Sequence, residues 1–313
     1  MRKNRIILMI FHSIQDMYDR YYWQGLGRKV TLSGHQIFYI DEGRSDEVIL
    51  VLHGFPTSSF DFKDVLRTLK QKYRVIIPDH LGFGFSDKPH GDYSYSLVEQ
   101  AQKIVELCQV LKLVKINVIA HDYGTSILTE LLALNQSGEL PIKLQKIILC
   151  NGSMLIHMAQ LRPIQRLLRL PVLGPIIGRL SNKAVFRRNL KKILARPEAI
   201  SESEISDMWD MIIINDGKRV IPKISRYTFE RVRHYDRWIG ALSRTQAEVL
   251  ILWGMSDPVA LADMAIELRN IISRSIFRSL PGLGHYPMLE DPHFWVQEVM
   301  DFLESDFEVI KRG

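Results

Sequence analysis

Short apolar runs separated by stretches of helical length are the feature that most limits how this chain folds. Six such runs are followed by small or polar residues: EVILVLHG (47–54), RVIIPDH (74–80), KINVIAH (115–121), KIILCNG (146–152), EVLILWG (248–254) and SIFRSLPG (275–282). The intervening stretches 94–111 and 125–137 have the length of helices. Apolar strands that alternate with helices are typical of a mostly parallel sheet covered on both faces. The sequence therefore predicts an α/β fold.

Two segments depart from this rhythm. Residues 30–41 alternate around Ser33-Gly34 and predict a β-hairpin ahead of the first parallel strand. The interval 152–247 is too long for one crossover, and the capping box Ser201-Glu202-Ser203-Glu204 starts a helical pattern inside it. We expect three parts: an N-terminal segment 1–29, a core formed by 30–152 and 246–313, and a helical cap at 153–245.

Composition narrows the class of function. The 313 residues are 46% hydrophobic and 24% charged, as in ordinary globular proteins. The net charge of +6 is modest and does not indicate a nucleic-acid partner. Cys108 and Cys150 lie in apolar patterns, which favours buried thiols in a reducing compartment. The ten histidines show no spacing such as H-E-x-x-H, so we expect no metal and no cofactor.

The N-terminal sequence MRKNRIILMIF has six apolar residues after its basic ones. A membrane span needs about 20, and a signal peptide needs a small-residue cleavage site that is absent here. We expect a cytoplasmic protein. The stretch 154–197 holds ten Lys or Arg and no acidic residue, interleaved with Leu and Ile. It is interpreted as a solvated helical face, as a peripheral membrane contact, or as a pocket for an anionic or acyl-chain substrate.

Residues suited to chemistry follow the predicted strands. In open α/β sheets, ligands bind beyond the carboxyl ends of the strands. Asp122, in INVIAHDYGTS, stands where a small-x-nucleophile-x-Gly elbow has its nucleophile. Asp257 and His285 come after the last two runs, so nucleophile, acid and histidine follow the chain order of α/β-hydrolases. His53-Gly54, Asp79 and Asn151 end the other runs.

The chain resembles the α/β-hydrolase superfamily, in the aspartate-nucleophile branch that includes epoxide hydrolases and haloalkane dehalogenases. The resemblance covers roughly residues 35–305 and rests on six motifs: LHGFPTSS (52–59), LGFGFSDKP (81–89), HDYG (121–124), NDG (215–217), RWIGAL (237–242) and HYPMLEDP (285–292). It implies an α/β-hydrolase fold, with a mostly parallel central sheet, helices on both faces and a helical cap inserted between strands. It also implies a catalytic triad of Asp122, Asp257 and His285.

An aspartate in the elbow indicates a particular reaction. A carboxylate is ionised at neutral pH and attacks without a base. It suits displacement at an sp3 carbon, which leaves an alkyl ester of Asp122. Water deprotonated by His285, with Asp257 orienting the imidazole, would hydrolyse that ester. The backbone N–H groups of Phe55 and Tyr123 are the expected oxyanion donors. The expected partners are a small hydrophobic electrophile and water.

The leaving group stays open. Haloalkane dehalogenases hold halide with N–H side chains at the positions of Phe55 and Tyr123, and phenylalanine has no donor. For a dehalogenase, Trp209 or Trp238 of the cap would have to serve instead.

Epoxide hydrolases use two cap tyrosines, and this chain has none between Tyr123 and Tyr227. Tyr235 matches the second of them best and is the expected substrate-binding residue, with His157 as a substitute for the first. We expect an epoxide hydrolase-like enzyme. A haloalkane or haloacid dehalogenase is the first alternative, and a non-catalytic or membrane-associated binding protein on the same scaffold is the second.

Overall fold

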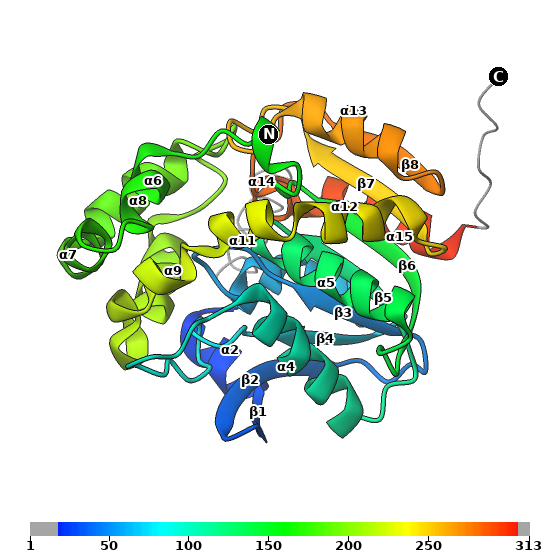
Figure 1. The fold of residues 1–313 in the computed structure, drawn as a ribbon, viewed down its shortest axis with the longest axis horizontal. Helices are drawn as coiled ribbons and strands as arrows, with labels where there is room; N and C mark the ends of the chain where they lie inside the picture. Colours follow the sequence, from blue (N-terminus) through cyan, green and yellow to red (C-terminus); the bar gives the residue numbers. More distant parts are fainter. Residues whose placement is uncertain (1–17, 306–313) are drawn as a thin grey trace, which may run out of the picture.

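The computed structural model describes residues 18–305. Within this range eight strands form one sheet, in the order β1-β2-β4-β3-β5-β6-β7-β8 (Figure 1). Pairings between β1, β2 and β4 are antiparallel, and all the others are parallel. The strands are β1 (Arg28–Leu32), β2 (His35–Glu42), β3 (Val48–Leu52), β4 (Arg74–Pro78), β5 (Lys115–His121), β6 (Lys143–Cys150), β7 (Glu248–Gly254) and β8 (Ser275–Leu280). The predicted hairpin and parallel strands are confirmed.

Helices cover both faces of the sheet because every other strand residue points to the same side. In β3, Val48, Leu50 and Leu52 join one apolar cluster, while Ile49 and Val51 join the other. The first cluster contains α4 (Leu97–Val110), α5 (Tyr123–Ser137) and α13 (Ala262–Ile271). The second contains α3 (Lys63–Leu69) and α15 (Pro292–Glu304). Three shorter helices complete the core: α2 (Arg20–Leu26), η1 (Ser59–Phe62) and α14 (Pro287–Glu290).

Between β6 and β7 the chain is helical. The helices are η2 (Ile156–Met158), α6 (Pro163–Leu168), α7 (Leu173–Leu180), α8 (Lys183–Lys191), α9 (Glu202–Ile213), η3 (Ile214–Arg219), α10 (Ile221–Ile224), α11 (Tyr227–Arg233) and α12 (Tyr235–Arg244). The Ser201–Glu204 capping box is present at the start of α9. Helices α6 to α9 gather at one side of the molecule, whereas α12 lies against α5 (Figure 1).

The carboxyl ends of the parallel strands gather the residues that the sequence singled out. Asp122 directly follows β5, Asn151 directly follows β6, and His53 directly follows β3. The loop after β7 carries Asp257, and the loop after β8 carries His285. Among residues 18–305, no helix is both long enough and apolar enough to cross a membrane. The predicted N-terminal segment lies largely outside the described residues.

Candidate active site

Asp122 occupies a sharp turn between β5 and α5. Its backbone has φ 43° and ψ −105°, a conformation that costs a non-glycine residue on the order of 1–3 kcal/mol. The turn requires α5 to start close to β3, and Gly124 permits this approach. A Cβ on Gly124 would lie 2.3 Å from the carbonyl oxygen of Leu52. The sequence pattern of the elbow therefore corresponds to a strained turn that presents the Asp122 side chain at the strand end.

The Asp122 carboxylate is buried and accepts a hydrogen bond from the loop after β3. The N–H of Phe55 donates to its Oδ2 at 3.0 Å. His53 fixes this loop: its Nε2 accepts from the N–H of His80 at 3.1 Å, and its Nδ1 donates to the carbonyl of Gly54 at 2.8 Å. Burial lowers the pKa of His53, which keeps the ring neutral in this tautomer. The predicted donor Phe55 is thus in place. Tyr123 is the first residue of α5, and the first N–H groups of a helix have no partner within the helix. The backbone N–H of Tyr123 is therefore not used by α5 itself.

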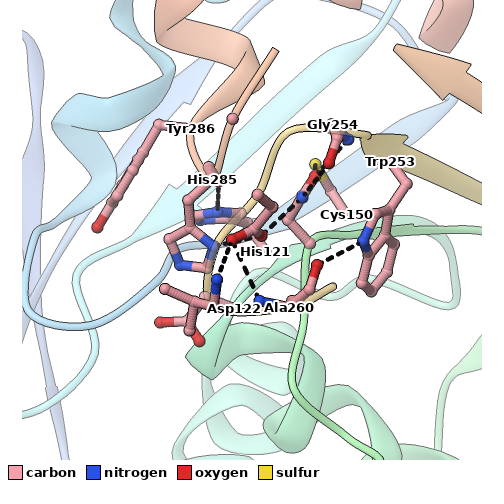
Figure 2. Close-up of polar contacts among 12 residues, drawn as sticks. His121, Asp122, Cys150, Trp253, Gly254, Ala260, His285 and Tyr286 are labelled. Atoms are coloured by element: carbon pink, nitrogen blue, oxygen red, sulfur yellow. Dashed lines mark hydrogen bonds and ion pairs between the residues drawn. The ribbon is translucent and has the colours of Figure 1, made fainter. Parts of the chain in front are cut away.

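His285 and Asp257 form a hydrogen-bonded pair. The Nδ1 of His285 lies 2.7 Å from Oδ2 of Asp257. The other Asp257 oxygen accepts from the N–H groups of Val259 at 2.7 Å and Ala260 at 3.1 Å. Figure 2 shows the imidazole of His285 near the Asp122 side chain. Burial alone would lower the pKa of His285. The negative charge and the hydrogen bond of Asp257, together with the charge of Asp122, have a larger effect in the opposite direction, so the pKa is raised above its ordinary value.

Two further side chains hold this pair. Asn151 donates from Nδ2 to Asp257 at 2.8 Å, and its Oδ1 accepts from the N–H of Gly254 at 2.9 Å. The Nε2 of His121 donates to the carbonyl of His285 at 2.8 Å. Burial lowers the pKa of His121 to about 4, so it is a neutral, positioning residue. The sequence placed Asn151 at a strand end but gave no signal for its bond to Asp257.

Arg231 of α11 is the functional candidate that sequence reasoning missed. Its side chain is 1% exposed, and Nη2 lies 3.8 Å from Oδ1 of Asp122. The same nitrogen donates to the carbonyl of Asp122 at 3.1 Å, and Nε donates to Oγ of Ser126 at 2.7 Å. Nη1 is buried without a hydrogen-bond partner among the described residues. Residues 219–237 contain five arginines, and no motif distinguishes this one.

Two tyrosines pack around the elbow. The Tyr123 side chain is enclosed by Phe83 and Tyr227, with ring centroids 5.2 Å and 5.1 Å away. Tyr227 stands one turn before Arg231 on α11, and the Arg231 guanidinium lies 4.6 Å from its ring centroid. Burial raises the pKa of Tyr227, and the negative charge of Asp122 raises it further, so the hydroxyl stays protonated. The ring of Tyr227 thus packs against Tyr123 and Phe55 at the elbow, and its protonated hydroxyl is able to donate a hydrogen bond.

The remaining predicted cap residues are spread out. Tyr235 packs on His157, an exposed residue, with ring centroids 5.7 Å apart, and neither lies in the cavity described below. The indole N–H of Trp238 donates to Glu130 at 2.6 Å and is occupied. Trp209 lines the cavity. The structure thus brings Asp122, Asp257, His285 and Phe55 together, and it separates Tyr235 and Trp238 from the cavity.

A cavity of about 130 Å³ lies between the cap and the core. Its wall contains His285 and Phe55 from the core, and Leu168, Phe186 and Trp209 are among the apolar side chains that the cap contributes. Asp122 is not part of the wall, so in this conformation a ligand reaches the carboxylate only after the cap or a wall side chain moves. A larger hollow, of about 630 Å³, lies at the amino ends of β6 and β7, the end of a parallel sheet where ligands seldom bind.

The order of the sheet, the strained elbow and the residues at its strand ends define the class of the protein. It is an α/β-hydrolase-type scaffold with an aspartate in the elbow. The chain belongs to the family described as alpha/beta hydrolase fold, whose model matches residues 47–292. Within residues 18–305, no group of three or more His, Cys, Asp or Glu side chains comes together that would hold a metal ion.

Two sequence relatives cover nearly the whole chain. "Putative hydrolase LipZ" of Mycobacterium tuberculosis is 37% identical over 281 residues, 90% of this chain and 96% of that protein. The mesoderm-specific transcript protein of Mus musculus is 38% identical over 295 residues, 90% of this chain and 87% of that protein. The predicted resemblance to the superfamily is confirmed by the family match over residues 47–292.

Solved structures show the same fold. The epoxide hydrolase CorEH has a TM-score of 0.73 at 19% identity, over 88% of this chain and 98% of its own. A loop variant of the haloalkane dehalogenase DbeA from Bradyrhizobium elkanii has a TM-score of 0.71 at 21% identity, over 88% and 97%. At this identity both likenesses concern the fold, and they do not distinguish between the two chemistries.

Proposed function

We propose that the protein is a hydrolase that opens an epoxide through an alkyl ester of Asp122. The observation that carries the proposal is the elbow itself. It presents a carboxylate, where α/β-hydrolases commonly have a serine, with a backbone amide on one oxygen and a His–Asp pair alongside. A carboxylate attacks a saturated carbon without prior deprotonation. The apolar cavity wall suits a small hydrophobic substrate.

In the first step, an Asp122 oxygen forms a bond to a ring carbon, and the C–O bond of the epoxide to that carbon breaks. The electron pair of the broken bond stays on the ring oxygen, which takes a proton. Tyr227 is our candidate donor, because its ring packs on Tyr123 and Phe55 at the elbow and its hydroxyl is protonated. Like Tyr235, it is not part of the cavity wall. Arg231 offsets negative charge at the same place. Tyr235 remains a prediction, although it lies outside the cavity wall.

In the second step, water attacks the carboxyl carbon of the ester. His285 takes the proton of that water, and Asp257 holds the ring in the required orientation. The N–H of Phe55 already donates to Asp122 Oδ2, so it is placed to hold the oxyanion that forms there. The ester bond to the carboxyl carbon then breaks and releases a diol. The proton on His285 goes to the leaving alkoxide. The proton that remains on the Asp122 carboxyl group returns to the Tyr227 phenolate, which restores both side chains for the next turnover.

Dehalogenation is the second candidate, and Trp209 is the observation in its favour. This indole lies in the cavity wall, whereas Trp238 is bound to Glu130 and Phe55 has no side-chain donor. A halide leaves without a proton, so dehalogenation would need an indole N–H and would not need Tyr227. The closed route to Asp122 favours a third reading, in which the scaffold binds a ligand and has no activity.

A product assay with matched variants separates these readings. Wild type, Y227F, Y235F and W209F are each given terminal epoxides and chloroalkanes of the same chain lengths, and diol and halide release are measured. We expect diol formation that falls by roughly 10²-fold or more in Y227F, the range typical of a lost acid catalyst, and persists in Y235F. Halide release that falls in W209F, without diol formation, would establish the dehalogenase. No product and no burst with either series would leave a non-catalytic binding protein.

A further inference from the structure

Helix α7 of the cap presents its apolar side to solvent. Its inner face is formed by Gly174 and Gly178, four residues apart and both buried. A Cβ on Gly174 would lie 2.0 Å from the carbonyl oxygen of Leu168, and one on Gly178 would lie 2.7 Å from Cγ of Pro222. The glycines therefore let the helix pack closely by its backbone. The large side chains consequently point outward, the reverse of an ordinary surface helix.

The outward side chains of α7 are joined by exposed apolar residues of the neighbouring α6 and of the α6–α7 turn. We call this surface the cap patch, and it consists of Leu167, Leu170, Val172, Leu173, Ile176 and Leu180. Each of these side chains is between 38% and 75% exposed. Within α7, Leu173, Ile176 and Leu180 recur at helical spacing on one face. Figure 1 shows α7 at the outer end of the cap, away from the sheet. Exposed apolar patches of this kind mark interaction sites.

Basic residues accompany the cap patch along the chain. Residues 154–197 contain ten Lys or Arg and no Asp or Glu. Arg166, Arg179, Arg188 and Lys192 are exposed and make no ion pair with any residue in the range 18–305. Arg187 and Lys191, by contrast, share Glu202. Arg166 and Arg179 are direct sequence neighbours of Leu167 and Leu180. A surface of exposed aliphatic and basic side chains is complementary to a bilayer, whose interior is apolar and whose surface can be anionic.

We propose that the cap patch docks the protein on an anionic lipid bilayer. Aliphatic side chains would enter the interface of the bilayer, while the basic side chains contact lipid phosphates. The patch consists of aliphatic side chains only. A second copy of the chain fits poorly, because two such basic surfaces repel each other.

The docking surface is joined to the cavity through shared helices. Helix α6 contributes Leu167 to the cap patch and Ile164 and Leu168 to the cavity wall. Helix α8 carries the exposed Arg188 and contributes Phe186 to the same wall. If the proposed function holds, the docked enzyme takes an amphiphilic electrophile from the bilayer. The docking proposal itself does not depend on turnover.

Vesicle co-sedimentation of the full chain tests the proposal. Vesicles of phosphatidylcholine alone are compared with vesicles containing about 30 mol% phosphatidylserine, an anionic lipid, at low and at high salt. The test variant is R179E/L180S. Its matched control is V114S/K143E, at the amino ends of the strands. Val114 is 74% exposed and Leu180 is 73% exposed, so the two serine substitutions each replace an aliphatic side chain of similar fractional exposure.

We expect wild type and the control variant to sediment with anionic vesicles at low salt. R179E/L180S should bind these vesicles at least tenfold more weakly than wild type. High salt should weaken the binding of wild type by at least the same factor. Absence of wild-type binding to anionic vesicles, or an equal loss in both variants, would overturn the proposal. So would a wild-type dimer in size-exclusion chromatography with light scattering that R179E/L180S dissociates, because the patch would then bind a second copy. Loss of turnover alone bears on the proposed function and not on docking.

Discussion

At the scale of single residues, the chemistry of the site depends on how the charge of one side chain shifts the pKa of the next. The carboxylate of Asp122 is one of the groups that raise the pKa of His285. Once Asp122 is esterified it is neutral, so this contribution disappears and the pKa of His285 falls. A histidine acts as a base only when it is unprotonated. Formation of the ester would therefore prepare His285 for the step that follows.

This coupling predicts the behaviour of a variant that mimics the ester charge. In D122N the side chain is neutral, so the pKa of His285, measured by NMR titration, should lie below that of wild type. The control variant D263N removes an exposed carboxylate on α13, and the pKa of His285 in this variant should equal that in wild type. In wild type, single-turnover ester hydrolysis should be slow below the pKa of His285 in the ester and rise as pH increases through it. An unchanged or higher pKa in D122N would show that the two groups do not interact.

At the scale of elements, the strained elbow depends on how closely α5 approaches β3. Gly124 allows this contact, since any Cβ there would meet the backbone of Leu52. The backbone of Leu52 belongs to a central strand, which has no freedom to withdraw. The cap is anchored at the same place, because Arg231 of α11 bonds to Asp122 and Ser126. Strand, helix and cap thus meet at one turn.

Replacement of Gly124 by alanine tests this packing. G124A should lower the free energy of unfolding by about 1–3 kcal/mol, the usual cost of overpacking, and should reduce turnover by displacing Asp122 from the Phe55 N–H. The control is G25A, within α2, where an added Cβ meets nothing within 4 Å. Because alanine favours helix over glycine, G25A should be as stable as wild type or more stable. Chemical denaturation measures both, and equal stability of G124A and wild type would contradict the close approach.

At the scale of the whole molecule, the sheet and the strand-end residues followed from sequence because their signals are local. Apolar runs, Gly-rich turns and the motifs around Asp122, Asp257 and His285 each occupy a few neighbouring positions. Arg231 could not be found this way, because its role arises from the packing of α11 against the elbow, 109 residues away along the chain. The same limit applies to Tyr227 and Tyr235. Sequence spacing favoured Tyr235, whereas the fold of the cap places Tyr227 in the field of Asp122.

The central claim is that Asp122 becomes esterified and that His285 frees it. The most direct test is intact-protein mass spectrometry of H285Q, with H90Q, an exposed histidine variant, as control. With an epoxide that wild type hydrolyses, H285Q should gain the full mass of the epoxide, and peptide mapping should place it on Asp122. H90Q should turn over without accumulating the adduct. An H285Q protein that stays unmodified by a substrate that wild type consumes would contradict the ester mechanism.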